Sequence, residues 1–407
     1  MSFVKRRNLP ELLAPAGSLE HLKAAVSAGA DAIYMGGEKF GARAYAQNFS
    51  REDMEAGVKF AHENGVKVYV TANIVAHNED LEGIREYFRE LKEVGPDALI
   101  ISDPGVFMIA KEVCPEIERH ISTQANNTNY ETFLFWYRLV AKRVVTAREL
   151  SLEEIRQIRA HIPDDLEIET FIHGAMCISY SGRCLLSNYL AGRDANRGAC
   201  AQPCRWNYHV MESTRPGQYF PVEETDEGTY IFNAKDLCMI EHLPELLDAG
   251  VDSLKIEGRN KSAYYVSVIT NAYRGALDAA IAGAPAPAWT QQEVVQVSHR
   301  EYCTGFFFGR EQAGQRYESS SYVRNCDVAA VVQRWENGRL YLSQRNRFFA
   351  GDALEVLAPG QAPVSITAAQ LQDGDGQSIE TANHAMMDCS IACATAFPAG
   401  SMIRKPV

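Results

Sequence analysis

The sequence of 407 residues contains no hydrophobic run long enough to cross a membrane. Its longest apolar helix candidate, residues 263–282, is interrupted by Asn271, Arg274 and Asp278, whereas a membrane span needs about 20 predominantly apolar residues. The N-terminus has a basic start but reaches Pro10 before any hydrophobic signal region can form. No low-complexity tract is present. We therefore expect a cytoplasmic protein that makes no membrane contact.

The motifs of several common enzyme classes are also missing. No Gly-x-Ser-x-Gly nucleophile elbow occurs, and residues 62–66 read His-Glu-Asn-Gly-Val instead of the His-Glu-x-x-His of zinc peptidases. No Gly-x-Gly-x-x-Gly follows the first predicted strand, which disfavours a Rossmann-like open sheet. The net charge of -12 argues against a broadly basic nucleic-acid-binding surface, although a local basic groove remains compatible with it.

What the sequence does contain is a repeated alternation of short apolar runs and amphipathic segments. The apolar runs are residues 12–14, 32–35, 66–71, 99–102, 119–123, 144–145, 166–173 and 253–256. Helix-capping signals lie between several of them, at Ser18, at Ser50 with Asp53, and at Ser151 with Glu154. This pattern predicts an α/β fold, a TIM-like (β/α)8 barrel, with a helix at residues 240–249 before the eighth strand.

The domain organisation follows from where this alternation stops. We predict a barrel over residues 1–284, with a cysteine-rich insertion at about residues 174–232 that contains a hairpin of residues 206–211 and 229–232. Residues 285–321 are predicted to be a linker whose aromatic stretch 301–308 docks on the barrel. Short alternating runs with turns such as Asn337-Gly338 then predict a small all-β barrel over residues 322–407.

Four of the ten cysteines lie close together, within the predicted insertion. They are Cys177, Cys184, Cys200 and Cys204, separated by six, fifteen and three residues. Four thiolates at one centre need a metal or an iron-sulfur cluster to offset their charge. A cluster tolerates such loose spacings, whereas structural zinc usually has tighter pairs in both halves of the motif. A zinc site and buried reduced thiols without a metal remain alternatives.

Polar residues at the C-terminal ends of the predicted strands would meet at the barrel mouth, where barrel enzymes place their sites. They are Asn73, Asp103, Gln124, Arg148, His173, Lys255, Glu257 and Arg259. Lys255, Glu257 and Arg259 share one side of an extended strand, which predicts binding of a small dicarboxylate. An internal ion-pair ladder that closes the barrel is the alternative. His173 is either a proton carrier or a hydrogen-bonded core histidine.

Several stretches together resemble a known family. Residues 169–177 read Glu-Thr-Phe-Ile-His-Gly-Ala-Met-Cys, and residues 181–187 read Ser-Gly-Arg-Cys-Leu-Leu-Ser. Further matches are residues 122–124, 233–237, 255–259 and 302–306. These motifs resemble the signature of the collagenase-like peptidase family along nearly the whole chain, with Cys303 as a departure from it.

The resemblance implies hydroxylation rather than proteolysis. Better understood members of the family hydroxylate the tRNA wobble uridine with prephenate, a ribosomal-RNA cytidine, or ubiquinone without O2. The resemblance also implies a four-iron, four-sulfur (4Fe-4S) cluster whose ligands are Cys177, Cys184, Cys200 and Cys204. The predicted C-terminal barrel resembles that of the tRNA-modifying branch.

We therefore hypothesise that the protein hydroxylates carbon 5 of the tRNA wobble uridine to give 5-hydroxyuridine, with prephenate as the oxygen source and without O2. The candidate catalytic residues are His173 and Glu257. The candidate substrate-binding residues are Lys255, Arg259, Arg148, Asn73 and Gln124. Arg183, Arg193 and Arg197 are expected to meet phosphates of the tRNA anticodon loop.

Three alternatives remain open at this point. They are a collagenase-like peptidase, a hydroxylase of ribosomal RNA or a quinone, and a non-catalytic RNA-binding protein with structural zinc. The sequence leaves the oligomeric state open, and also any need for a paralogous partner.

Overall fold

The computed structural model describes residues 9–41, 48–206, 224–225, 228–229, 234–309, 325–358 and 360–406. The chain divides into two compact units. The first comprises Met1–Leu22, Asp31–Lys261 and Arg300–Tyr322, and the second comprises Lys23–Ala30, Ser262–His299 and Val323–Val407. Among the described residues, no helix is both long and apolar enough to cross a membrane.

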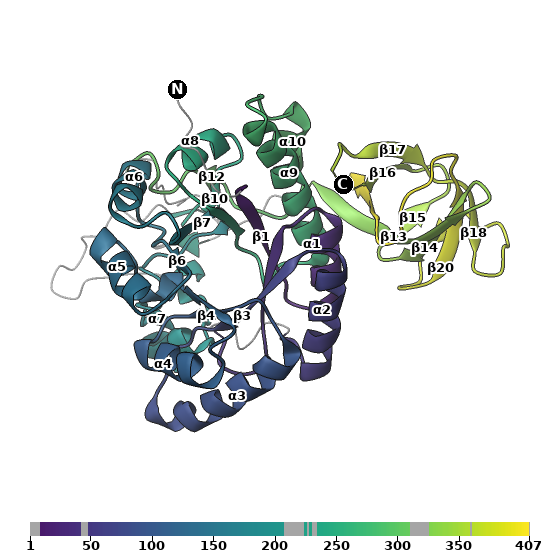
Figure 1. The fold of residues 1–407 in the computed structure, drawn as a ribbon. Coiled ribbons are helices and arrows are strands. Elements are labelled where there is room, and N and C mark those ends of the chain that lie inside the picture. The colour runs from purple at the N-terminus through teal and green to yellow at the C-terminus, as the bar shows by residue number, and fades with distance from the viewer. Residues whose placement is uncertain are drawn as a thin grey trace. The chain divides into compact units, whose positions relative to one another are not determined.

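The first unit contains a closed barrel of eight parallel strands (Figure 1). They are β1 (Glu11–Pro15), β2 (Ala32–Gly36), β3 (Lys67–Ala72), β4 (Ala98–Ile101), β5 (Glu118–Ile121), β6 (Arg143–Val145), β7 (Glu167–Ala175) and β11 (Ser253–Ile256). Strand β11 pairs with both β1 and β7, which closes the ring. The predicted (β/α)8 barrel is thereby confirmed, and the open Rossmann-like sheet is wrong.

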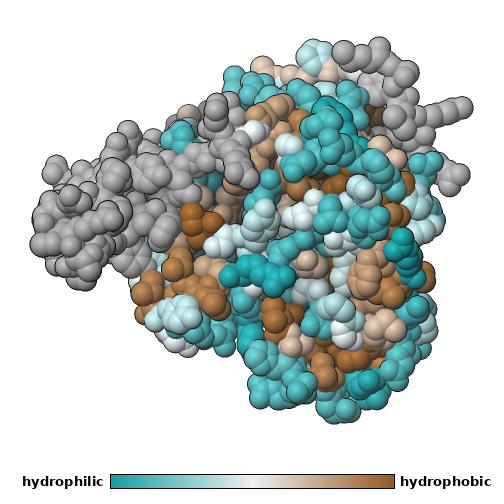
Figure 2. Space-filling view, turned by 90° about the vertical axis from the view of Figure 1, so that its left-hand side faces the viewer, coloured by the Kyte–Doolittle hydropathy of each residue, from teal (hydrophilic) through white to brown (hydrophobic). Residues whose placement is uncertain are grey.

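Helices follow the strands along the chain and surround them (Figure 1). They are α1 (Leu19–Ser27), α2 (Arg51–Glu63), α3 (Leu81–Val94), α4 (Pro104–Val113), α5 (Tyr130–Arg138), α6 (Leu152–His161) and α8 (Leu243–Asp248). The side chains of Ser50 and Ser151 cap α2 and α6 as predicted. Figure 2 shows the side of α5 and α6, where hydrophobic residues reach the surface in separate patches.

The chain leaves the barrel after β7 and returns through β10 (Asp236–Cys238), which pairs antiparallel with the end of β7. Strand β12 (Tyr302–Cys303) pairs in turn with β10, and Leu152 N donates a hydrogen bond to Phe307 O, so residues 302–307 lie against the barrel. The predicted hairpin of residues 206–211 and 229–232 falls largely outside the described residues. From residue 224 to the start of the second predicted strand, the described residues form a shorter antiparallel pair of β8 (Glu224–Thr225) and β9 (Gly228–Thr229).

The second unit contains α9 (Ala263–Ile281), α10 (Ala288–Val294) and an antiparallel sheet. The sheet strands are β13 (Cys326–Glu336), β14 (Arg339–Gln344), β16 (Ala353–Leu357), β17 (Val364–Thr367), β18 (Ala369–Asp373), β20 (Asp388–Ala392) and β21 (Met402–Pro406); β15 (Phe348–Phe349) pairs separately with β19 (Thr381–Ala382). The all-β C-terminal domain is confirmed, but its sheet runs from β17 to β18 as a half-barrel. Asn337 and Gly338 both have positive φ, as a two-residue hairpin between β13 and β14 requires.

Candidate active site at the barrel mouth

A cavity of about 140 Å³ opens at the C-terminal ends of the barrel strands. It is lined by residues from the ends of the strands and from residues 176–206, here called the cysteine segment. Of the residues predicted from the sequence, those in the lining are Asn73, Gln124, Arg148, Lys255, Glu257, Arg259, Cys177, Cys184, Cys200 and Cys204. The structure therefore brings the strand-end residues and the four cysteines to one place.

The cysteine segment is held over the mouth by hydrogen bonds to barrel loops. Asn126 Nδ2, in the loop after β5, donates to Ser181 O over 2.8 Å, and Val75 N, after β3, donates to Asn196 O over 3.1 Å. Within the segment, α7 (Leu186–Ala191) ends at Gly192 in the left-handed region. These contacts fix the segment at both its beginning and its end.

Arg197 makes the strongest of these attachments. Its guanidinium donates to both carboxylate oxygens of Asp80, over 2.7 and 2.9 Å. Burial alone would raise the pKa of Asp80, but hydrogen bonds from His77 N and Arg197 hold it below its ordinary value. Arg197 is thus an anchor of the cysteine segment, and its expected contact with RNA phosphates stays a prediction.

The four cysteines are reduced in the structure and differ in exposure: Cys177 and Cys200 are exposed, and Cys184 and Cys204 are half-buried. Cys177 Sγ accepts a hydrogen bond from Arg148 Nη2 over 3.8 Å, and Cys200 Sγ accepts one from Gln202 N over 3.3 Å. Hydrogen bonds to the ligand sulfurs are among the features that tune an iron-sulfur cluster. Within the described ranges, no three His, Cys, Asp or Glu side chains are already arranged around a metal position. The donor set fits a cluster, and the cysteines share one cavity without a coordination geometry.

Arg259 is a buried cation in the lining, 4% exposed. Its guanidinium donates to Thr71 Oγ1 over 3.2 Å and to Asn48 Oδ1 over 2.8 Å. A Cβ at Gly36 would lie 2.3 Å from Arg259 Nη2, so only glycine at the end of β2 leaves space for this side chain. The fold therefore fixes a positive charge at the mouth.

Lys255 lies one layer deeper, with an exposure of 5%. Its Nζ is 2.8 Å from Glu169 Oε1 and lies over the rings of Tyr34 and Phe171, at 4.4 and 5.4 Å from their centroids. The predicted dicarboxylate contact and the predicted internal ion pair are thus compatible: Lys255 makes the ion pair and also lines the cavity.

Glu257 stands between Lys255 and Arg259 in the sequence and also lines the cavity. Its Oε2 accepts a hydrogen bond from Tyr34 Oη over 3.4 Å, and its backbone N donates to His173 O over 2.9 Å. A Cβ at Gly174, where φ is +106°, would lie 2.6 Å from Glu257 O. Glycine at this position lets β7 pass close to the chain that carries Glu257 into the lining.

Arg148 lines the cavity, whereas His173 is buried outside the described lining. Arg148 Nη1 and Nη2 donate to Ala175 O and Ser181 Oγ, which ties the start of the cysteine segment to the loop after β6. His173 is 1% exposed, and its Nε2 lies 3.3 Å from Tyr302 Oη. Since His173 is not part of the described cavity lining, the structure favours a hydrogen-bonded core histidine.

Asn73 and Gln124 line the cavity from the loops after β3 and β5. Asn73 Nδ2 donates to Ser122 Oγ over 3.1 Å. Gln124 Oε1 is buried and accepts no hydrogen bond from the residues that the structure describes. A buried amide oxygen without a donor is costly, and a ligand that donates a hydrogen bond there would remove that cost.

Sequence reasoning missed the acidic residue behind Lys255. Glu169 is fully buried, yet it stands in the middle of strand β7, among apolar neighbours. A carboxylate inside an apolar strand was the available signal, because such a group needs a cationic partner. Tyr34 and Thr71, which line the cavity, carried no comparable signal.

The fold and the site define a TIM-barrel protein with a cysteine-lined mouth. The chain belongs to peptidase family U32, whose profile matches residues 17–317. The C-terminal domain of the same family matches residues 324–404. The family resemblance inferred from the motifs is thereby confirmed.

Relatives of known name cover almost the whole chain. The chain is 38% identical to tRNA hydroxylation protein P1 of Bacillus subtilis, over 97% of this chain and 94% of the relative. It is 37% identical to tRNA hydroxylation protein P of Escherichia coli, over 92% of this chain and 91% of the relative. The 23S rRNA 5-hydroxycytidine C2501 synthase of E. coli is 41% identical over 67% of this chain and 40% of its own length.

Proposed function

We propose that this protein is an RNA hydroxylase, and that its substrate is the wobble uridine of tRNA, which it converts to 5-hydroxyuridine with prephenate as the oxygen source. The observation that carries the proposal is the shared cavity, where four cysteines and the cations Lys255 and Arg259 meet. The similarity to tRNA hydroxylation proteins along nearly the full chain supports the choice of tRNA.

The cations suit a small substrate with two carboxylates, as prephenate has. Arg259 offers a guanidinium held by Thr71 and Asn48, and Lys255 offers an ammonium held by Glu169. Because both are ordered before binding, little side-chain freedom is lost when a carboxylate arrives. Glu257 stands between them in the sequence and also lines the cavity, where its carboxylate would repel an anion placed next to it.

Cys177, Cys184, Cys200 and Cys204 would hold a 4Fe-4S cluster above this anion site. When bound, such a cluster supplies redox chemistry that side chains cannot. Arg148 would donate to the sulfur of Cys177, as it does in the structure. The cysteine segment would exclude bulk water from the cavity.

The RNA would enter from the open side of the cysteine segment. An anticodon-loop base is already unpaired, so turning it into the mouth costs little. Tyr180 lines the cavity and is 46% exposed, which suits stacking on a neighbouring base. Arg183 borders an adjacent open hollow with Tyr180 and would meet a phosphate there.

The test is complementation of a strain that lacks the gene, read by mass spectrometry of tRNA nucleosides. The wild-type gene and Cys393→Ala, a half-buried cysteine of the second unit, should restore 5-hydroxyuridine, whereas Cys184→Ala should not. Full restoration by Cys184→Ala would refute a required cluster. Iron and sulfide analysis of the anaerobically purified protein, with near four of each per chain, is the matching biochemical result.

Ribosomal RNA is the second candidate substrate, because the E. coli ribosomal-RNA hydroxylating relative matches 67% of this chain. The same deletion strain distinguishes the two. Loss of 5-hydroxycytidine from ribosomal RNA with unchanged tRNA would replace the lead proposal.

A further inference from the structure

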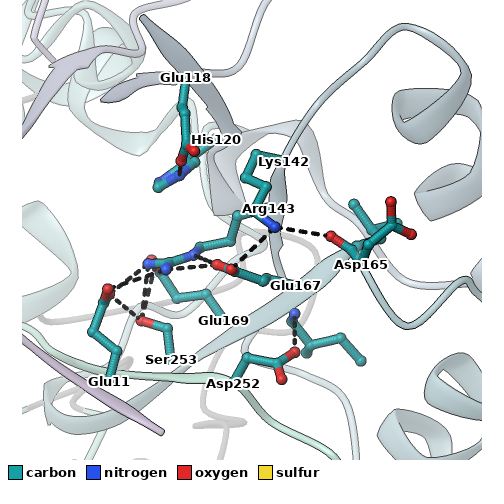
Figure 3. A network of polar contacts seen from close by, with 12 residues as sticks. Glu11, Glu118, His120, Lys142, Arg143, Asp165, Glu167, Glu169, Asp252 and Ser253 are labelled. Carbon is teal, nitrogen blue, oxygen red and sulfur yellow. Dashed lines mark hydrogen bonds and ion pairs between the residues drawn. The ribbon is translucent and has the colours of Figure 1, made fainter. Parts of the chain in front are cut away.

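The interior of the barrel contains a group of charged side chains and one serine hydroxyl in contact with one another, here called the buried charge cluster. Its members are Glu11, Arg143, Glu167, Glu169, Ser253 and Lys255 (Figure 3 shows all but Lys255). Arg143 Nη1 lies 2.6 Å from Glu11 Oε1 and 3.1 Å from Glu169 Oε2. TIM-barrel interiors are usually filled by branched apolar side chains, so this polar interior calls for an explanation.

Glu169 is the member that connects the cluster to the cavity. It is fully buried, with Oε2 facing Arg143 and Oε1 facing Lys255 Nζ over 2.8 Å. Lys255 is the cluster residue that lines the mouth. The Glu169 carboxylate is therefore shared by two cations: Arg143 in the barrel interior and Lys255 at the cavity.

We infer that Glu169 is a positioning residue that holds Lys255 Nζ at the cavity, where the ammonium receives a carboxylate of the small-molecule substrate. The inference rests on the proposed anion-binding role of this cavity. Glu169 itself lies behind Lys255 and is not part of the cavity lining.

The surroundings of Lys255 explain why it needs this partner. The residue is 5% exposed and lies over the rings of Tyr34 and Phe171. A buried ammonium without an ionic partner is costly, and the Glu169 carboxylate supplies that partner. In the described part of the chain, Glu169 is its one hydrogen-bond acceptor, which leaves two N–H groups for a ligand.

Ionisable groups from several strands lie around Glu169 and Lys255. Glu11 on β1 and Arg143 on β6 belong to the buried charge cluster, and the ring of Tyr34 on β2 lies against the Lys255 ammonium. Burial raises the pKa of Tyr69 on β3 and lowers that of His120 on β5, which favours the neutral form of both side chains. Glu169 is therefore the anionic partner that Lys255 contacts.

Glu169→Gln tests the inference directly, because glutamine has the same size but no charge. The full-length protein, with lysines labelled at 13Cε, is compared with the variant by NMR without ligand at pH 7, and the Lys255 signal is assigned from its loss in Lys255→Met. We expect the chemical shift of this signal at pH 7 to differ between the wild type and Glu169→Gln, because Lys255 Nζ loses its carboxylate partner in the variant.

Calorimetric titration with prephenate provides the functional readout. In Glu169→Gln the affinity at pH 7 should fall by about 10-fold or more, because the carboxylate that holds the Lys255 ammonium in place is lost. Glu169→Asp retains the charge and should keep most of the wild-type affinity. Glu167→Gln is the matched control: Glu167 also binds Arg143, over 2.7 Å, but makes no contact with Lys255 in the structure.

The two readouts separate failure of this inference from failure of the proposed function. A Lys255 signal that is unchanged in Glu169→Gln would overturn the inference whatever the substrate is. If the signal moves as expected but the wild type binds no prephenate, the positioning role holds and the proposed oxygen donor is wrong. Should Glu169→Gln not fold, Glu169→Asp takes its place: its carboxylate is one methylene shorter, so the Lys255 signal should move, and an unchanged signal would overturn the inference.

Discussion

Replacement of Arg143 by methionine should strongly destabilise the barrel. The guanidinium is 4% exposed and contacts Glu11, Glu167 and Glu169, so its loss leaves several carboxylates in the interior without their main partner. Removing one partner of a buried ion pair typically costs about 3–5 kcal/mol.

The ionisation of Glu11 gives an independent magnitude. Burial alone would raise its pKa, but the charge and hydrogen bonds of Arg143, with a hydrogen bond from Tyr69, lower it from 4.5 to about 2. At about 1.36 kcal/mol per pKa unit, this shift corresponds to about 3 kcal/mol. The two values agree, so we expect Arg143→Met to lower the free energy of unfolding by at least about 3 kcal/mol at pH 7.

The pH dependence has a definite sign. A carboxylate with a lowered pKa contributes stability that is complete above its unfolded pKa, 4.5, and is lost as the pH falls toward its folded pKa, about 2. In Arg143→Met, burial dominates and raises the pKa of Glu11. Protonation of Glu11 in acid then removes the cost of a buried carboxylate that has lost its cationic partner. The stability difference between the two proteins should therefore be largest near pH 7 and shrink on acidification.

Urea unfolding followed by circular dichroism at several pH values measures this difference. Arg89→Met is the control, because Arg89 pairs with Glu86 on the surface of α3 and should cost less than about 1 kcal/mol. A cost below about 1 kcal/mol for Arg143→Met at pH 7, or a difference that grows in acid, would refute the reasoning.

Three further predictions concern the mouth of the barrel. Gly36→Ala should displace the Arg259 guanidinium and weaken prephenate binding by about 10-fold or more, measured by calorimetry, with no change in iron content. Arg197→Ala should make the cysteine segment more sensitive to limited proteolysis while the barrel melts within about 4 °C of the wild type; equal cleavage rates would contradict its role as an anchor. Tyr180→Ala should weaken binding of a tRNA anticodon stem-loop by about 10-fold in an anisotropy titration, whereas Tyr189→Ala, also exposed but outside the cavity, should not.

Local signals in the sequence predicted local structure well. Ser151 and Glu154 form the capping box expected from their spacing, and Asn337-Gly338 makes the expected hairpin. The helix predicted at residues 240–249 begins later, at Leu243, because Pro244 is accommodated in a first turn, where no backbone N–H is needed. These features depend on residues only a few positions apart.

Contacts between distant residues were not predictable in the same way. Glu169 and Lys255 are 86 positions apart, and Arg197 and Asp80 are 117 apart. Their pairing is decided by the register of the strands and the path of the loops, which composition and periodicity do not encode. The sequence therefore predicted most of the polar residues that gather at the mouth, although Asp103 and His173 are not in the described cavity lining. It did not predict which of these residues neutralise one another.

The place of the cysteine segment in the chain bears on how the protein is assembled and repaired. The chain leaves the barrel after Ala175 and returns at Ser253, yet β7 and β11 are direct hydrogen-bonded neighbours. The ring of strands is thus complete without any contribution from the segment. A metal centre on these cysteines, as proposed above, would then be loaded and lost at the rim, while the ring of strands stays closed.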